Sequence, residues 1–72
     1  MDQIKVNGIY KHFKGNTYRV LGVARHSESL EELVVYQHID GEKEIWARPI
    51  AMFLDEADVD GKKVPRFQYI GE

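Results

Sequence analysis

Arginine and aromatic side chains are the residues of this sequence whose types and spacing best fit a binding site. An arginine can stack on an aromatic face while its guanidinium offers a fork of donors to a carboxylate or phosphate. Two arginines lie next to prolines and rings, so their backbone is stiffened. We therefore predict a site for a peptide-like or anionic small ligand, formed by Tyr10, His12, Tyr36, Trp46, Arg48 and Arg66.

A purely structural role for the same residues is the alternative explanation. The chain has 12 acidic side chains, any of which can pair with an arginine. Tyrosine and tryptophan are also needed to fill the core of so small a domain. The sequence leaves both explanations open. They are distinguished by whether Arg48 and Arg66 converge on an open pocket or are each paired with a carboxylate.

Histidine chemistry has weaker support. His12 and His38 fall on either side of one predicted strand, about 10 Å apart, whereas zinc ligands lie within about 2.1 Å of the metal. His26-Ser27-Glu28 has the residue types of a catalytic triad, but adjacent residues of a strand point to opposite sides. The chain has no cysteine, and its isolated glycines match no phosphate-binding fingerprint. We expect no metal site and no cofactor.

Charge is unevenly distributed along the chain. The formal net charge is −2, which disfavours non-specific binding to duplex nucleic acid. Basic side chains are in excess over residues 1–26 and 62–72, and acidic ones over residues 27–61. A dipolar surface that orients a charged partner is one interpretation, and an evenly mixed surface is the other. The cations that could follow a single strand of RNA are Lys11, Lys14, Arg19 and Arg25.

The length of 72 residues fits one domain with a small core, residues 1–72. No apolar run approaches the ~20 residues of a membrane span. The N-terminus lacks the basic and apolar regions of a secretory signal. We therefore expect a cytoplasmic protein that does not associate with membranes.

The elements that position these residues are predicted to be short strands, because glycine, asparagine, proline and aspartate recur at short intervals. The strongest strand pattern is at residues 33–39, where β-branched and aromatic residues gather. The other strands are predicted at residues 8–13, 18–26, 43–47 and 66–70, with turns at 14–17 and 40–42.

Pro49 ends the fourth strand because proline has no N–H for a β ladder, and its fixed φ suits the first turn of a helix. Residues 49–54 then carry apolar side chains at helical spacing, which predicts a short helix or 3-10 turn across the sheet. Residues 55–63 are predicted to form an acidic, mobile loop. The apolar side chains at helical spacing are Ile50, Phe53 and Leu54.

These elements predict a mainly all-β fold, a small, SH3-like, strongly bent five-stranded antiparallel barrel with one short helix or 3-10 turn. A flat sheet of this size would expose its edges, whereas a partly open barrel hides them around one core. The first hairpin pairs Tyr10 with Leu21 or with Gly22. We prefer Gly22, which puts Tyr10 and His12 on one face with Tyr18, Val20 and Ala24.

Several segments of the chain form a distinctive set of motifs. They are Gly8-x-Tyr10-x-His12-x-Lys14-Gly15, Tyr18-x-Val20, Ala24-Arg25-His26-Ser27-Glu28, Val34-Val35-Tyr36-Gln37, Trp46-x-Arg48-Pro49-x-x-Met52-Phe53 and Arg66-Phe67. This set resembles the bacterial family of domains of unknown function numbered 1653, over nearly the whole chain. Ala47 departs from the resemblance, which implies a larger apolar residue there. The family implies a compact bacterial domain and no activity.

The function predicted from the residues is a non-catalytic binding module that uses the aromatic and arginine cluster. Binding of single-stranded RNA is the first alternative, with bases stacked on tyrosine or tryptophan. An enzyme in which His12 or His26 acts as a general base is the second alternative. Because a partly open barrel leaves strand edges, both a monomer and a weak homodimer fit the prediction.

Overall fold

The computed structural model describes residues 4–41 and 43–72. The chain is mostly β, with antiparallel sheets and one short helix, as predicted. Glu42, in the predicted turn of residues 40–42, lies outside the described residues. The elements are β1 (Ile9–His12), β2 (Thr17–Arg25), β3 (Glu32–His38), β4 (Ile45–Pro49), α1 (Ile50–Phe53), β5 (Glu56–Val59), β6 (Lys62–Pro65) and β7 (Phe67–Gly71).

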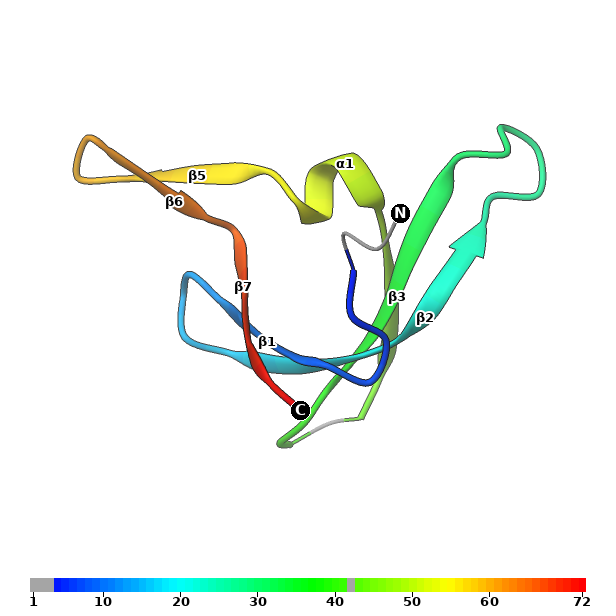
Figure 1. The fold of residues 1–72 in the computed structure, drawn as a ribbon, viewed down its shortest axis with the longest axis horizontal. Helices are drawn as coiled ribbons and strands as arrows, with labels where there is room; N and C mark the ends of the chain where they lie inside the picture. The colour runs from blue at the N-terminus through cyan, green and yellow to red at the C-terminus, as the bar shows by residue number, and fades with distance from the viewer. Residues whose placement is uncertain (1–3, 42) are drawn as a thin grey trace.

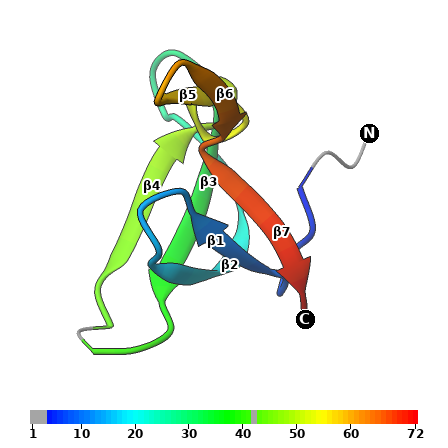
Figure 2. The same ribbon diagram turned by 90° about the vertical axis from the view of Figure 1, so that its left-hand side faces the viewer.

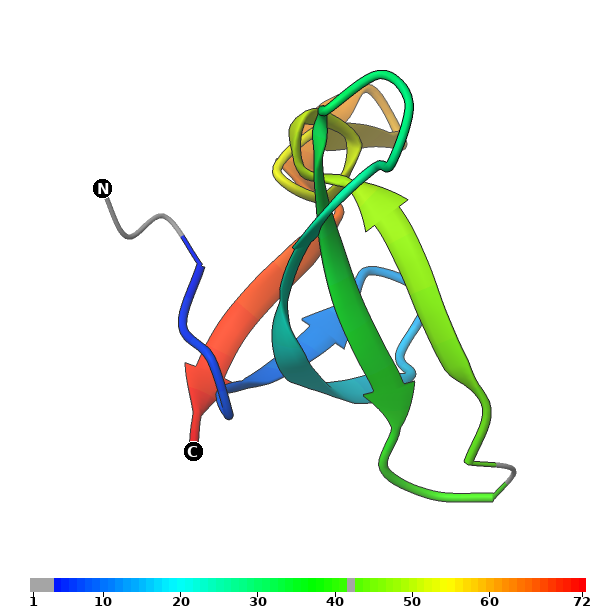
Figure 3. The ribbon, with the colours of Figure 1, turned by 90° about the vertical axis from the view of Figure 1, so that its right-hand side faces the viewer.

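Five strands form the main sheet in the order β4-β3-β2-β1-β7 (Figure 1). They correspond to the five strands predicted from the sequence, with ends shifted by a few residues. The sheet is strongly bent, and its edge strands β4 and β7 lie on opposite sides in Figure 2 and again in Figure 3. No ladder joins these two edges in the described residues, so the strands do not close into a barrel.

The prediction of an acidic, mobile loop at residues 55–63 is wrong, because most of this segment belongs to the β5–β6 hairpin. Val59 pairs with Lys62, which leaves Asp60 and Gly61 as a two-residue loop with φ of 53° and 81°. A loop with two positive φ angles is the type I′ turn, for which Asp-Gly is a preferred pair. The signal was therefore present in the sequence. Figure 1 shows the hairpin extending away from the main sheet.

The first hairpin pairs Tyr10 with Tyr18, so neither predicted register is correct. Gly15 has φ of 108°, and its N–H donates to the carbonyl oxygen of His12 at 2.8 Å. The N–H of His12 donates in turn to the carbonyl oxygen of Asn16 at 2.7 Å. A glycine at positive φ thus ends a three-residue loop that is centred earlier in the chain than we predicted.

A β-bulge in β2 reverses the face of the sheet to which the following side chains of this strand point. Val20 pairs with Tyr36, and Gly22 pairs with Val35, so Leu21 is an extra residue. The side chains of Tyr10, Tyr18 and Val20 share one face, as the preferred register predicted. Beyond the bulge the alternation is reversed, and Ala24 lies on the opposite face.

The core lies between the bent sheet and α1. Phe53 of α1 is completely buried, and Ile50 packs against the core. Leu54 is 42% exposed, so the predicted apolar side of the helical turn contains only the other two side chains. In residues 4–41 and 43–72 no helix is long and apolar enough to cross a membrane. The buried cluster consists of Ile4, Tyr10, Val20, Val34, Tyr36, Phe53 and Phe67.

The close approach of two segments at Gly8 gives a test of this packing. A Cβ at Gly8 would lie 2.7 Å from Cε1 of Tyr69 and 2.9 Å from the carbonyl oxygen of Lys5, and the backbone atom cannot move aside. We expect Gly8→Ala to lower the free energy of unfolding by about 1–3 kcal/mol, measured by urea denaturation.

Gly22→Ala is the matched control, because a Cβ there meets no atom within 4 Å and the backbone needs no positive φ. The control is expected to change stability by less than about 0.5 kcal/mol. Equal effects of the two substitutions would contradict the close approach at Gly8.

Candidate functional site

The inner face of the main sheet carries most of the predicted ligand-binding residues. Successive side chains of a strand alternate between faces, and the registers align Tyr36 with Trp46 and Tyr10 with Tyr18. Arg48 therefore shares the inner face with Trp46, two residues away on β4. His12 pairs with Phe67, the residue that follows Arg66. The pairing of strands thus brings distant parts of the sequence to one surface.

Three rings form the floor of this surface. Tyr18 lies edge-on to Tyr36 with their centroids 5.2 Å apart, and Phe67 lies 5.8 Å from Tyr18 and 5.5 Å from Tyr36. Tyr18 and Phe67 are not among the six site residues predicted from the sequence. The preferred register already places Tyr18 on the face of Tyr10 and His12, but Phe67 depends on the pairing of β7 with β1, which is distant in sequence.

Arg48 lies over this floor. Its Nε–H donates to the hydroxyl oxygen of Tyr36 at 3.3 Å, and its guanidinium carbon lies 5.6 Å from the centroid of Phe67. Arg48, Tyr18, Tyr36 and Trp46 line a hollow of about 220 Å³, and Trp46 is 49% exposed. The ion pairs of the described residues do not include Arg48. Among these residues, its positive charge therefore borders the hollow without a carboxylate partner.

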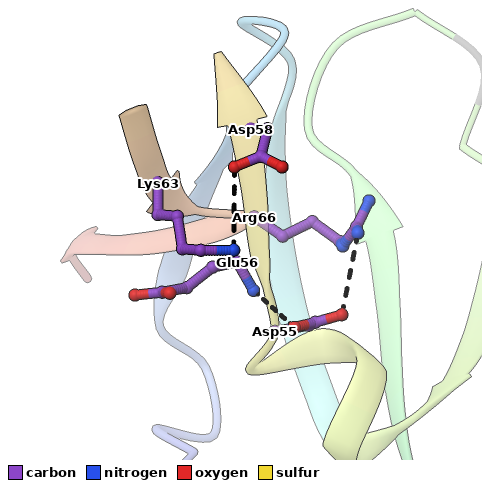
Figure 4. A network of polar contacts seen from close by, with 5 residues as sticks. All are labelled: Asp55, Glu56, Asp58, Lys63 and Arg66. Atoms are coloured by element: carbon purple, nitrogen blue, oxygen red, sulfur yellow. Dashed lines mark hydrogen bonds and ion pairs between the residues drawn. The ribbon is translucent and has the colours of Figure 1, made fainter. Parts of the chain in front are cut away.

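Arg66 is held differently from Arg48. Its guanidinium lies 6.0 Å from the centroid of Phe13, and its Nη2 lies 3.8 Å from Oδ2 of Asp55. The same carboxylate accepts the backbone N–H of Glu56 at 2.7 Å (Figure 4). The Nε–H of Arg66 is buried and has no acceptor among the residues that the structure describes. In the part of the chain that the structure describes, Arg66 is thus paired with an acid and Arg48 is not.

His12 packs against the two rings, Phe13 and Phe67, that the guanidinium groups of the two arginines approach. Its ring is 4.6 Å from that of Phe13 and 4.9 Å from that of Phe67, and its Nδ1 accepts the backbone N–H of Lys14 at 3.2 Å. Burial lowers the pKa of the His12 imidazole, and the charges of Arg48, Arg66 and Lys14 lower it further. Three permanent cations are therefore close enough to act on one imidazole. We call His12, Lys14, Arg48 and Arg66 the basic cluster.

Tyr10 does not belong to this surface. Its side chain is only 4% exposed and packs against Phe53 and Tyr69, with centroid separations of 5.3 and 5.5 Å. Its hydroxyl oxygen accepts the backbone N–H of Lys5 at 2.9 Å. Tyr10 is therefore a core residue whose polar tip holds the N-terminal segment, which is the structural role that the sequence left open.

The other two histidines make different contacts. The His26 Nδ1 accepts the N–H groups of Glu28 and Ser29, so it organises the β2–β3 loop. The His38 ring packs against Tyr18, one of the rings that line the hollow, at 4.5 Å. Within the described ranges, no group of three or more His, Cys, Asp or Glu side chains is placed to hold a metal ion.

Known proteins place the chain in one family. The family described as "Protein of unknown function (DUF1653)" matches residues 8–69. The crystal structure of a DUF1653 protein from Bordetella bronchiseptica is 32% identical in sequence, with a TM-score of 0.86. The similarity covers 99% of this chain and 92% of that one. No curated protein matches the chain. Because the family match spans most of the chain and the bacterial structure covers nearly all of it, this chain belongs to the DUF1653 family.

Proposed function

We propose that this chain is a non-catalytic binding module, and that the hollow beside Arg48 takes an anionic group. The observation that carries the proposal is the state of Arg48, whose guanidinium borders the hollow and whose partner is a hydroxyl group rather than a carboxylate. A half-buried charge is costly to desolvate unless it is paired. An anion in the hollow would supply the missing partner, and its second oxygen could accept from the guanidinium fork.

The size of the hollow limits the ligand. Its volume of about 220 Å³ lies below the ~300–1,000 Å³ of pockets that take drug-sized molecules. A carboxylate side chain or a small free anion would fit this space. The rings of Tyr18, Tyr36 and Trp46 offer apolar contact to the carbon atoms that carry the charge.

Binding of single-stranded RNA is less favoured by the geometry. Lys11 and Arg19 alternate with the inner-face residues of β1 and β2, so they lie on the opposite face from the rings. The Arg19 guanidinium donates to the carbonyl oxygen of Asn7, and that of Arg25 to the carbonyl oxygen of Leu30. Of the four predicted cations only Lys14 belongs to the basic cluster, so they do not form the continuous track that a nucleic-acid backbone would require.

An enzyme with a histidine base is also less favoured. The Nδ1 atoms of His12 and His26 both accept backbone N–H groups, so neither is free to take a proton without losing that bond.

For the fold, we propose an SH3-like barrel that is left open between β4 and β7. The support is the strong bend of a five-stranded antiparallel sheet around one core.

Removing the Arg48 charge tests the proposed site. Arg48→Gln should lower the affinity for sulfate by about 10- to 100-fold, because charge-assisted hydrogen bonds contribute about 1.5–3 kcal/mol. Fluorescence of the single tryptophan, Trp46, and amide chemical shifts measure binding at constant ionic strength. Arg25→Gln removes the same charge from a guanidinium that donates to the carbonyl oxygen of Leu30, and it should leave the affinity nearly unchanged. Equal losses in both variants would contradict a site at Arg48.

Asp55 is expected to compete with the ligand for the basic cluster, because its carboxylate pairs with Arg66. Asp55→Asn should raise the sulfate affinity about two- to fivefold, the equivalent of an exposed ion pair of about 0.2–1 kcal/mol. The matched control is Asp58→Asn, which removes the same charge from the pair with Lys63 on the same hairpin. If both variants bind sulfate more tightly to the same extent, only net charge is involved.

The sulfate affinity should rise as the pH falls. Burial and the charges of Arg48, Arg66 and Lys14 lower the pKa of His12 in the free protein, and a bound anion would raise this pKa again. The gain in affinity is then complete below the free-state pKa and is lost as the pH rises through the bound-state pKa. His12→Gln should abolish this pH dependence in titrations, whereas His26→Gln should keep it. An unchanged slope in His12→Gln would exclude His12 as the linked group.

A further inference from the structure

β4 is an open edge of the main sheet. The strand order places it beside β3 alone, and in Figure 3 its outer side faces away from the other strands. Among the described residues, none of the backbone hydrogen bonds outside the ladders uses a group of Ile45–Pro49. Alternate N–H and C=O groups along such an edge have no protein partner.

The protection of this edge against strand addition is confined to the end of β4. Natural edge strands carry lysines, inward charges, prolines or bulges that prevent pairing. β4 has no lysine, and its pairing with β3 is regular along its length. Arg48 is an inward charge, which an acidic partner would neutralise. Ile45 is 62% exposed and Trp46 is 49% exposed, so two large apolar side chains stand beside the open backbone. Pro49, at the end of β4, limits the length over which another strand can pair.

β7, the other edge of the sheet, also has no lysine, but it differs from β4 in two respects. Its segment Phe67–Gly71 carries no charged side chain that could pair with an acidic partner. Its pairing with β1 is irregular between Ile9 and Tyr10, and Gly71 has φ of 132°. Of the two edges, β4 is thus the one that combines a regular backbone with a cation-lined hollow.

The hollow lies on the side of β4 where an added strand would present its side chains. Trp46 and Arg48 point to the inner face, and Ile45 and Ala47 to the outer face. A strand paired with β4 would lie about 4.8 Å away, with every second side chain on the inner face. One such side chain would lie beside Arg48, and the next inner-face side chain, two residues along the added strand, would lie beside Trp46.

We infer that the ligand of the hollow is an acidic segment of another protein, which binds in an extended conformation as an added strand on β4. The inference rests on the proposed function and specifies its partner. A carboxylate side chain of the segment enters the hollow and pairs with Arg48. The backbone of the segment completes the β4 ladder, and apolar side chains on either side of the acidic residue cover Trp46 and Ile45.

Charge and chemistry together favour this partner over other anions. The positive charges of Arg48, Arg66 and Lys14 all act on His12, so together they attract a negatively charged partner. A free anion or a nucleic acid would satisfy Arg48 but has no amide groups to pair with the β4 edge. An extended peptide uses both features, because strand addition takes its affinity from the main chain and its specificity from alternate side chains.

Backbone methylation of a peptide tests the inference without altering the protein. The probe is a short peptide, blocked at both ends, in which threonine alternates with valine around a single glutamate. Two further peptides carry N-methyl groups on one or the other alternate set of amides. One set should lower the affinity at least about tenfold and the other should not, because only alternate N–H groups of an added strand face the edge. Replacing the glutamate by glutamine should also cost about tenfold.

Amide chemical shifts identify the surface that is used. The unmodified peptide should shift the amides of β4, whereas sulfate should shift only those around Arg48. Equal binding of both methylated peptides would overturn strand addition, and if sulfate still binds at Arg48 the proposed function stands. If neither probe perturbs Trp46 or Arg48, both proposals fail. Stronger competition by a single-stranded oligonucleotide, or protection of the β4 amides that grows with protein concentration alone, would also overturn the inference.

Discussion

The ring of Phe53 stacks on Phe67 with their centroids 4.1 Å apart and their planes within 5° of parallel, and most of the structure depends on this contact. Phe53 comes from α1 and Phe67 from β7, so the stack joins the helical turn to the last strand of the sheet. Tyr10 and Tyr36 pack around the same ring of Phe53. A chain without cysteine has no disulfide to replace this contact, so burial of aromatic side chains keeps the bent sheet and α1 packed around the small core.

The same contact positions the candidate site. Phe67 lies under the guanidinium of Arg48 and against the ring of His12, so its position in the core fixes both. The basic cluster then draws on three separate regions of the chain: the end of β1 with the turn that follows it, β4, and the residue before β7. A chain with a formal charge of −2 thereby presents a locally positive surface, and the acidic β5–β6 hairpin contributes Asp55 at its border.

Local sequence signals predicted the existence of most elements. The β-branched run of β3, the stop at Pro49 and the apolar spacing that includes Phe53 act over a few residues, so the chain itself reports them. The Asp60-Gly61 pair is also a local signal, and it indicates the turn of the β5–β6 hairpin. The prediction of a loop there is wrong because the two flanking strands are short and polar, which hides the strand pattern. The register of the first hairpin depended on which of several turn residues adopts positive φ, and Gly15 does so.

For the site, the sequence determined which side chains were available and, through alternation, that Trp46 and Arg48 share a face of β4. Only the tertiary structure decided that Tyr10 is a core residue, that Arg66 is paired with Asp55, and that Arg48 bonds to the hydroxyl oxygen of Tyr36. The physical reason is the separation in sequence over which each effect acts. Strand periodicity is set by each residue's own backbone, whereas the neighbours of a charge come from strands that are distant in sequence, and their positions follow from the packing of the whole sheet.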